Sequence, residues 1–189
     1  MKLSSFIKDS FQEYEGKYSL ILFSTGCNLD CLGCYNKSSH NQDTYDAMEI
    51  LENYLNPMHE AVVFLGGEPT LWKDLPDIMK YVKSKNLQIK LFTNALFPYM
   101  IESVLPYVDS FSVDLKTLTG SENVLGVSLP NYLKTVMESL DMIIDSGKEL
   151  EVRTTKWKNV NTKEIIDFMR MKYPSVRHIV QEDFYEGHY

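Results

Sequence analysis

All three cysteines of this 189-residue chain lie within eight positions, at Cys27, Cys31 and Cys34. An odd, tightly clustered set with no distant cysteine does not form a disulfide framework and indicates metal ligation. Thiolates favour zinc and iron–sulfur clusters. Three thiols on one loop can bind three irons of a 4Fe–4S cube and leave the fourth iron without a protein ligand. The alternative is a structural zinc site of three cysteines completed by His40.

A second group of polar residues lies at or near the ends of predicted strands. Two glycines precede an acid in Gly66-Gly67-Glu68, and Thr93-Asn94 closes a later apolar run. The remaining members are Asp114, Lys116, Arg153 and Gln181. Because the carboxyl ends of parallel strands meet at one rim, we expect these side chains to gather around the cysteines.

Apolar or β-branched runs predict six short strands separated by helices. The strands are expected at 18–23, 61–65, 89–93, 110–115, 151–155 and 179–181, and helices at 47–55, 75–82, 129–144 and 165–171. Ser128 and Asn161 are the expected N-caps of the last two helices, and Gly147 is expected to close the third. Strictly alternating strands and helices predict an α/β fold, a partial (β/α)6 TIM-type barrel with parallel strands. Length and the absence of linkers favour one domain over residues 1–189.

Composition excludes several classes of protein. The formal net charge of -7 lacks the basic footprint of a nucleic-acid-binding protein. The first residues hold no apolar signal core, and no apolar run reaches the length of a membrane span. We therefore expect a cytoplasmic protein with protein or small-molecule partners, without nucleic acid or membrane. His59, His178 and His188 have no partner at ligand spacing and are expected to be surface or packing residues.

The cysteine spacing C-x₃-C-x₂-C, followed by GGEP after the next strand, resembles the radical S-adenosylmethionine superfamily. The segment YEGKYSLILFSTGCNLDCLGCYNKSS is similar to the opening of anaerobic ribonucleoside-triphosphate reductase activating proteins. The stretches GGEPTL, LPYVDSFSVDLKTLTG and EVRTT continue that resemblance to about Gln181. Pyruvate formate-lyase activating enzymes share much of the layout.

The resemblance implies one 4Fe–4S cluster on Cys27, Cys31 and Cys34, with S-adenosylmethionine bound at the open iron. In the superfamily an electron from the reduced cluster cleaves the sulfonium and gives a 5′-deoxyadenosyl radical. In the activating enzymes this radical takes a hydrogen atom from a glycine of a partner enzyme. The resemblance implies two partners. One is a glycyl radical enzyme, namely anaerobic ribonucleotide reductase, and the other is an external one-electron donor such as flavodoxin.

By the same resemblance, Glu68 and its two glycines bind the amino group of S-adenosylmethionine, and Asp114 and Lys116 lie near the cosubstrate and a cation. Arg153 interrupts an apolar strand, and inside a barrel it would need an anionic partner, such as the cosubstrate carboxylate. Tyr35 and Asn36 are expected to pack over the cluster and adenine, and Thr93 and Asn94 to contribute oxygens. Plainer roles stay open. Glu68, Thr93 and Asn94 could be polar turn residues, Tyr35 a core aromatic residue, and Arg153 an outward-facing residue paired with Glu151 or with water.

Three positions depart from the patterns of relatives. Phe92 replaces an acid that often precedes the Thr-Asn pair, which puts a cation site in doubt. Gln181 replaces a histidine of pyruvate formate-lyase activating enzymes, and this favours the reductase activators. Gly33 replaces the consensus aromatic before the third cysteine, as is usual in reductase activators.

Three other functional classes remain open. A small-molecule radical enzyme such as 7-carboxy-7-deazaguanine synthase would use the same cluster and glycine-rich loop on a pterin-like ligand. An electron-transfer iron–sulfur protein would neither bind nor cleave S-adenosylmethionine. A zinc-stabilised interaction domain would contain no iron.

Overall fold

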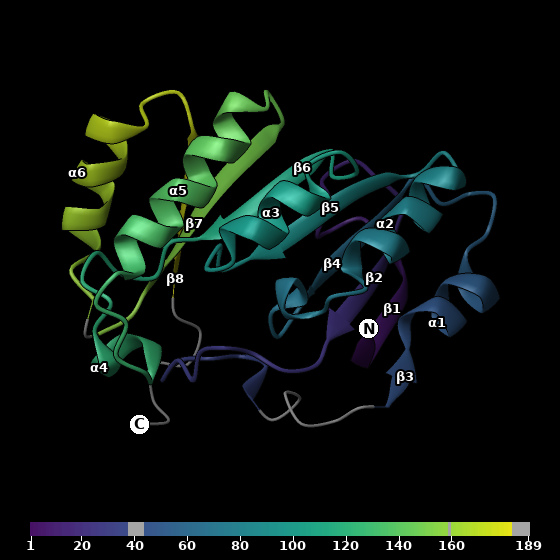
Figure 1. The fold of residues 1–189 in the computed structure, drawn as a ribbon, viewed down its shortest axis with the longest axis horizontal. Helices are drawn as coiled ribbons and strands as arrows, with labels where there is room; N and C mark the ends of the chain where they lie inside the picture. The colour runs from purple at the N-terminus through teal and green to yellow at the C-terminus, as the bar shows by residue number, and fades with distance from the viewer. Residues whose placement is uncertain (38–43, 159, 183–189) are drawn as a thin grey trace.

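The computed structural model describes residues 1–37, 44–158 and 160–182. Their strands form one eight-stranded sheet (Figure 1). Its order is β3-β1-β2-β4-β5-β6-β7-β8. The strands are β1 (Lys2–Ser10), β2 (Ser19–Ser24), β3 (Tyr45–Asp46), β4 (Ala61–Gly66), β5 (Gln88–Thr93), β6 (Ser110–Asp114), β7 (Glu149–Lys156) and β8 (Arg177–Glu182). From β2 to β8 neighbouring strands are parallel and follow chain order, which confirms the predicted partial barrel of parallel strands.

Two further strands were not predicted. β1 pairs antiparallel with β2, and β3 pairs antiparallel with β1 through Lys2 and Leu3. The expectation of six strands alone was therefore wrong at this edge. Within the described part of the chain the β3–β1 edge does not pair with β8, so the sheet is an open barrel rather than a closed one.

Helices follow most of the parallel strands and lie over one face of the sheet (Figure 1). They are α1 (Ala47–Tyr54), α2 (Leu75–Ser84), α3 (Pro98–Val104), α4 (Glu122–Leu125), α5 (Tyr132–Asp145) and α6 (Thr162–Lys172), with a short 3₁₀ helix, η2 (Pro69–Leu71). The predicted helices correspond to α1, α2, α5 and α6, whereas α3, α4 and η2 were not foreseen. No described helix is both long and apolar enough to span a membrane.

The helix α5 begins later than its apolar pattern predicted. Asn131 occupies the N-cap position, so Ser128 does not cap the helix. The Leu129 N–H instead donates to the Gly120 carbonyl, and Pro130 disfavours helical backbone at the residue before it. The other two predicted ends are confirmed. Asn161 accepts a hydrogen bond from the Glu164 N–H, and Gly147 follows α5 with a φ of 69°.

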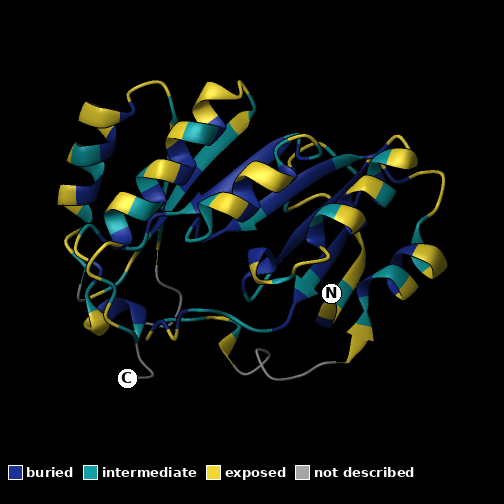
Figure 2. Cartoon of the chain, in the orientation of Figure 1, coloured by how far each residue is buried: buried dark blue, intermediate teal, exposed yellow. Residues whose placement is uncertain are grey.

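Alternate strand residues build two apolar layers. Leu20 and Leu22 of β2 belong to the large core beneath the helices, whereas Ile21 packs on the other face with Val63 and Leu65 of β4. Figure 2 shows the strands mostly buried and the helices exposed on their outer sides. The smaller layer, without a covering of helices, forms the concave wall on which a ligand site can be built.

Candidate cofactor site

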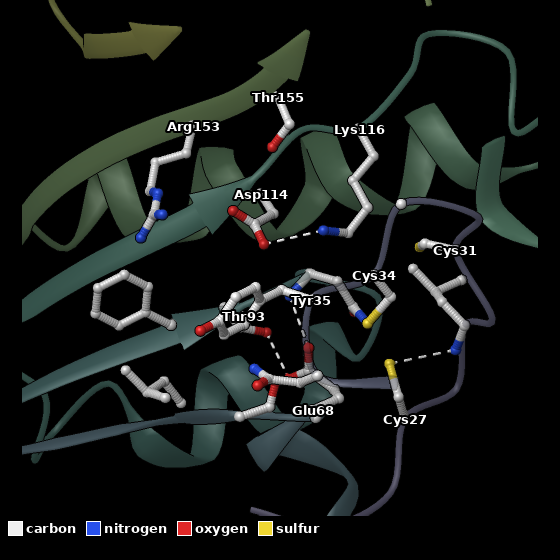
Figure 3. Close-up of a pocket in the computed structure, with 18 of the residues that line it drawn as sticks. Cys27, Cys31, Cys34, Tyr35, Glu68, Thr93, Asp114, Lys116, Arg153 and Thr155 are labelled. Carbon is white, nitrogen blue, oxygen red and sulfur yellow. Dashed lines mark hydrogen bonds and ion pairs between the residues drawn. The ribbon is translucent and has the colours of Figure 1, made fainter. Parts of the chain in front are cut away.

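A cavity of about 480 Å³ lies at the carboxyl ends of the parallel strands. Every site residue predicted from the sequence lines it: Cys27, Cys31, Cys34, Tyr35, Asn36, Gly66, Gly67, Glu68, Thr93, Asn94, Asp114, Lys116, Arg153 and Gln181. Figure 3 shows the three thiols on one side of the cavity and residues of the later strands on the other. The fold thus brings together groups that are up to 154 positions apart in the chain (181 − 27).

The cysteine loop follows β2 and is held in place by the segment around α4. The Asp30 N–H donates to the Leu125 carbonyl at 2.9 Å, and the Leu32 N–H donates to the Val124 carbonyl at 3.4 Å. Gly126 has a φ of 69°, and a side chain there would meet the Asp30 carbonyl oxygen at 2.0 Å. The loop is therefore positioned by backbone contacts with a distant part of the sequence.

Burial controls the protonation of the cysteine thiols. Desolvation raises the pKa of Cys27 to about 12 and raises the pKa of Cys31, while the Lys116 charge opposes both shifts. Without metal these two thiols are neutral at physiological pH. A bound iron would replace the proton and stabilise the thiolate.

The cysteine arrangement fits a cluster better than a single ion. Among the described residues no three His, Cys, Asp or Glu side chains are arranged to hold one metal ion. A 4Fe–4S cube makes no such demand, since each thiolate binds a different iron. Three soft ligands at one end of a cavity match that donor set. His40, the proposed fourth zinc ligand, and His188 lie outside the described residues.

The glycine-rich loop after β4 packs directly against the start of the cysteine loop. Gly66 has a φ of 111°, and a Cβ on Gly67 would lie 1.9 Å from the Gly26 carbonyl oxygen. The Gly67 N–H donates to the Ser24 carbonyl at 2.9 Å, and the Glu68 N–H donates to the Gly26 carbonyl at 2.8 Å. Only residues without a side chain allow this contact, which fixes Glu68 next to Cys27.

Glu68 is buried and serves as the acceptor of a hydrogen-bond network. Its Oε1 accepts from the Thr70 N–H (3.1 Å), the Thr70 hydroxyl (2.5 Å) and the Thr93 hydroxyl (2.8 Å). Its Oε2 accepts from the Asn94 N–H at 2.7 Å. Desolvation raises the pKa of Glu68, and these hydrogen bonds oppose the rise. A cation bound at Oε2 would offset the remaining cost of burying the charge.

Two amide side chains connect this network to the cysteine loop. The Asn94 side chain donates to Asn28 Oδ1 at 2.7 Å, and the Asn36 side chain donates to the Gly66 carbonyl at 3.2 Å. Asn94, at the end of β5, therefore binds Glu68 through its backbone N–H and the cysteine loop through its side chain. The structure gives Thr93 and Asn94 a specific role in orienting Glu68, beyond that of polar turn residues.

The far wall carries two basic residues. Lys116 Nζ lies 2.9 Å from Asp114 Oδ2. Burial acts to lower the pKa of Lys116, but the charge and hydrogen bond of the Asp114 carboxylate outweigh it and raise the pKa above its usual range. The lysine is therefore charged, and it places a positive charge near Cys31.

Arg153 faces the cavity, so the outward-facing alternative was wrong. Its guanidinium donates to Gln181 Oε1 at 3.0 and 2.8 Å and lies 5.0 Å from the centre of the Phe92 ring. Glu151, the partner in that alternative, instead pairs with Lys90 at 3.1 Å. In the described part of the chain no carboxylate lies within ion-pair distance of Arg153.

Tyr35 lies at the rim of the cavity with 75% of its surface exposed, so it is not a core aromatic residue. Sequence reasoning missed other cavity residues, including Thr155 and Trp157 beyond Arg153. Their spacing of two residues, from Arg153 through Thr155 to the residue directly after β7, was the signal that could have identified them, because alternate strand residues share a face. His59 is buried and packs against Tyr18, as expected of a packing residue.

Comparison with known proteins identifies relatives with several different described activities. The chain is 31% identical over 119 residues to the "Putative glycyl-radical enzyme activating enzyme MJ1227" of Methanocaldococcus jannaschii, covering 60% of this chain and 50% of that protein. It is 34% identical over 113 residues to a protein of the same description from Haemophilus influenzae, covering 55% and 43%. A GTP 3',8-cyclase of Helicobacter pylori is 25% identical over 173 residues, covering 86% and 53%.

Solved structures share the fold. The crystal structure of Streptococcus suis SuiB bound to S-adenosylmethionine superposes with a TM-score of 0.65 at 20% identity, covering 86% of this chain and 40% of that one. The chain spans about half the length of the curated relatives it matches. The sequence profile of the Radical SAM superfamily matches residues 21–171 of this chain. The chain therefore belongs to the radical S-adenosylmethionine superfamily, whose cofactors are a 4Fe–4S cluster and S-adenosylmethionine.

Proposed function

We propose that residues 1–189 act as one radical S-adenosylmethionine domain that activates a glycyl radical enzyme, and that this partner is anaerobic ribonucleotide reductase. The bound cofactors supply the one-electron chemistry, with the electron delivered by an external donor such as flavodoxin. Relatives described as activating enzymes of glycyl radical enzymes support the class of partner. The reductase rests on the motif resemblance around the cysteine loop.

The residues of the cavity divide the work of holding the cofactors. Cys27, Cys31 and Cys34 are the cluster ligands. Glu68 receives the ammonium group of S-adenosylmethionine, because its carboxylate is buried beside the cysteines and its Oε2 accepts one hydrogen bond from the described residues, that of the Asn94 N–H. Arg153 receives the carboxylate, because its charge is bound to an amide oxygen and is not neutralised by an acid. These two opposite charges match the two charged ends of an amino acid.

The open side of the barrel is the observation that carries this proposal. The sheet ends at β8 without returning to β3 or β1, so the described strands leave one side unclosed. From the cysteines the cavity continues along an apolar wall of Phe23, Leu65 and Phe92 to Ile7 of β1. An extended, glycine-bearing segment of a large protein can enter from such an open side.

The charges of the cavity argue against a nucleoside triphosphate as substrate. Such a substrate is suggested by the name of the relatives called GTP 3',8-cyclase. Four acids line the cavity, Glu13, Glu68, Asp114 and Glu182, against two basic residues, Lys116 and Arg153. Lys116 already pairs with Asp114. A triphosphate needs several cations, so an uncharged stretch of polypeptide fits this lining better.

The test is anaerobic reconstitution with iron and sulfide, followed by reduction in the presence of S-adenosylmethionine. We expect about four irons per chain, slow formation of 5′-deoxyadenosine, and faster formation with a glycyl radical doublet in the EPR spectrum when the reductase is added. Cys27→Ala, Cys31→Ala and Cys34→Ala should each abolish cleavage and the doublet.

The experiment with the reductase has a separate control and a separate outcome that would contradict the proposal. A reductase whose radical glycine is changed to alanine should give no doublet while still binding the activating enzyme. Binding should weaken with salt, because an acidic surface meets a complementary one and exposed charges are screened within about 8 Å at physiological ionic strength. Stimulation of cleavage by GTP or a pterin-like heterocycle, and not by the reductase, would replace this proposal with a small-molecule reaction.

A further inference from the structure

The wall of the cavity at the end of β7 includes a tryptophan that belongs to none of the motifs recognised in the sequence. Arg153, Thr155 and Trp157 lie at alternate positions along the chain, and all three line the cavity. Figure 3 shows Arg153 and Thr155 in the upper part of the view, across the cavity from Glu68 and Cys27. Trp157 follows directly after β7, so its place is set by the same alternation that turns Arg153 inward.

The indole of Trp157 occupies the space that a side chain at position 33 would need. A Cβ built on Gly33 would lie 2.5 Å from Trp157 Nε1 and 2.9 and 3.0 Å from the two adjoining ring carbons. Gly33 directly precedes Cys34, so the ring packs on the cysteine loop beside the third thiol. The indole of Trp157 therefore fits only because residue 33 has no side chain.

The indole N–H of Trp157 is buried and has no hydrogen-bond partner among the described residues. The other tryptophan, Trp72, donates its N–H to the Thr25 carbonyl at 3.0 Å. A buried donor without an acceptor is rare in native proteins and calls for an explanation. At the wall of a cavity that binds cofactors, the explanation is an acceptor that arrives with the ligand.

We propose that Trp157 is a cofactor-contacting residue: its ring closes the cavity against Gly33, and its N–H donates to a hydrogen-bond acceptor of the bound cofactors. The inference rests on the proposed cofactor site. Two acceptors share the required chemistry, a sulfur of the cluster and a nitrogen or oxygen of S-adenosylmethionine. The Lys116 ammonium, 5.8 Å from the indole ring, marks the same part of the cavity as one that attracts an electron-rich group.

The deciding variant is Trp157→Phe, which keeps an aromatic ring and removes the N–H. We expect it to load as much iron as the wild type. If the acceptor is a cluster sulfur, the midpoint potential measured without S-adenosylmethionine moves to a more negative value, because an N–H donor stabilises the reduced cluster. If the acceptor belongs to S-adenosylmethionine, that potential is unchanged and the dissociation constant rises roughly fivefold. Wild-type values of both quantities would overturn the proposal.

Controls separate a specific contact from damage to the fold. Trp72→Phe removes the tryptophan that already has a protein acceptor and does not line the cavity, and it should change neither quantity. It also leaves Trp157 as the only tryptophan of the chain, whose emission should change on titration with S-adenosylmethionine. Gly33→Ala, which displaces the indole, should change the same quantity as Trp157→Phe. Loss of iron in the cysteine variants tests the cluster site itself, so the two proposals fail in different measurements.

Discussion

Replacing Glu68 by alanine should destabilise the metal-free protein as well as abolish ligand binding. The carboxylate accepts hydrogen bonds from Thr70, Thr93 and the Asn94 backbone in a fully buried setting. Alanine would leave the Thr70 and Asn94 N–H groups without an acceptor, at about 1–3 kcal/mol each. Relief from burying a charge returns part of this cost. We expect a net loss of about 3 kcal/mol in the free energy of unfolding.

Glu68→Gln separates the two roles of this side chain. The amide retains most of the hydrogen bonds but leaves one backbone N–H facing an NH₂ group, so the loss of stability should be only about 1 kcal/mol. The charge partner of the ammonium group is gone, and the affinity for S-adenosylmethionine should fall by about 3 kcal/mol, or roughly a hundredfold. Glu13→Gln is the matched control, since it neutralises another cavity carboxylate that lies outside this network.

The assays are urea unfolding of the metal-free protein and equilibrium binding of S-adenosylmethionine to the reconstituted protein. With a slope of about 2 kcal/mol per molar urea, the alanine variant should unfold about 1.5 M earlier than the wild type. An alanine variant with the wild-type midpoint would refute the structural role of Glu68. A glutamine variant with wild-type affinity would refute its role as a ligand.

Two further outcomes follow from the packing. Gly67→Ala should lower the free energy of unfolding, measured in urea, by about 2 kcal/mol or more, because its Cβ would overlap the rigid Gly26 carbonyl at 1.9 Å. In the control Gly16→Ala, where φ is 75° and the surrounding space is open, the free energy of unfolding should fall by only about 1 kcal/mol. Burial lowers the pKa of His178, which is hydrogen-bonded to Thr154. The unfolded imidazole gains a proton below about pH 6.5, which the folded form resists, so wild-type stability should fall as the pH drops below that value. His178→Gln should reduce this loss between about pH 7.5 and about pH 5.5, and an unchanged pH slope would contradict the assignment.

The sequence predicted the parallel part of the fold well, for a physical reason. Strands buried on both faces, such as Ala61–Gly66, form uninterrupted apolar runs that stand out from their surroundings. β1 was missed because most of its residues are exposed, and its sequence KLSSFIKDS has no clear alternation of apolar and polar residues. β3 is two residues long and exists only through its pairing with β1. Nothing local in the sequence distinguishes such a strand.

The candidate site divides in the same way. Residues next to strands and inside recognisable motifs were located from the sequence, and the fold places all of them around one cavity. Sequence reasoning could not supply the direction in which a side chain points. Arg153 was left with two orientations because β7 carries charged or polar residues on both faces, and only its pairing with β8 decides between them. Trp157 lies outside every motif and packs at the site against Gly33, which is 124 positions away (157 − 33).

The anchoring of the cysteine loop by α4 determines when, during protein synthesis, the site can first exist. The backbone hydrogen bonds that hold Asp30 and Leu32 come from Val124 and Leu125, and the last wall of the cavity comes after β7. A ribosome that has released only the cysteine loop presents three thiols on an unsupported segment. The complete site can therefore form only after most of the chain has emerged, so we expect cluster loading to follow folding.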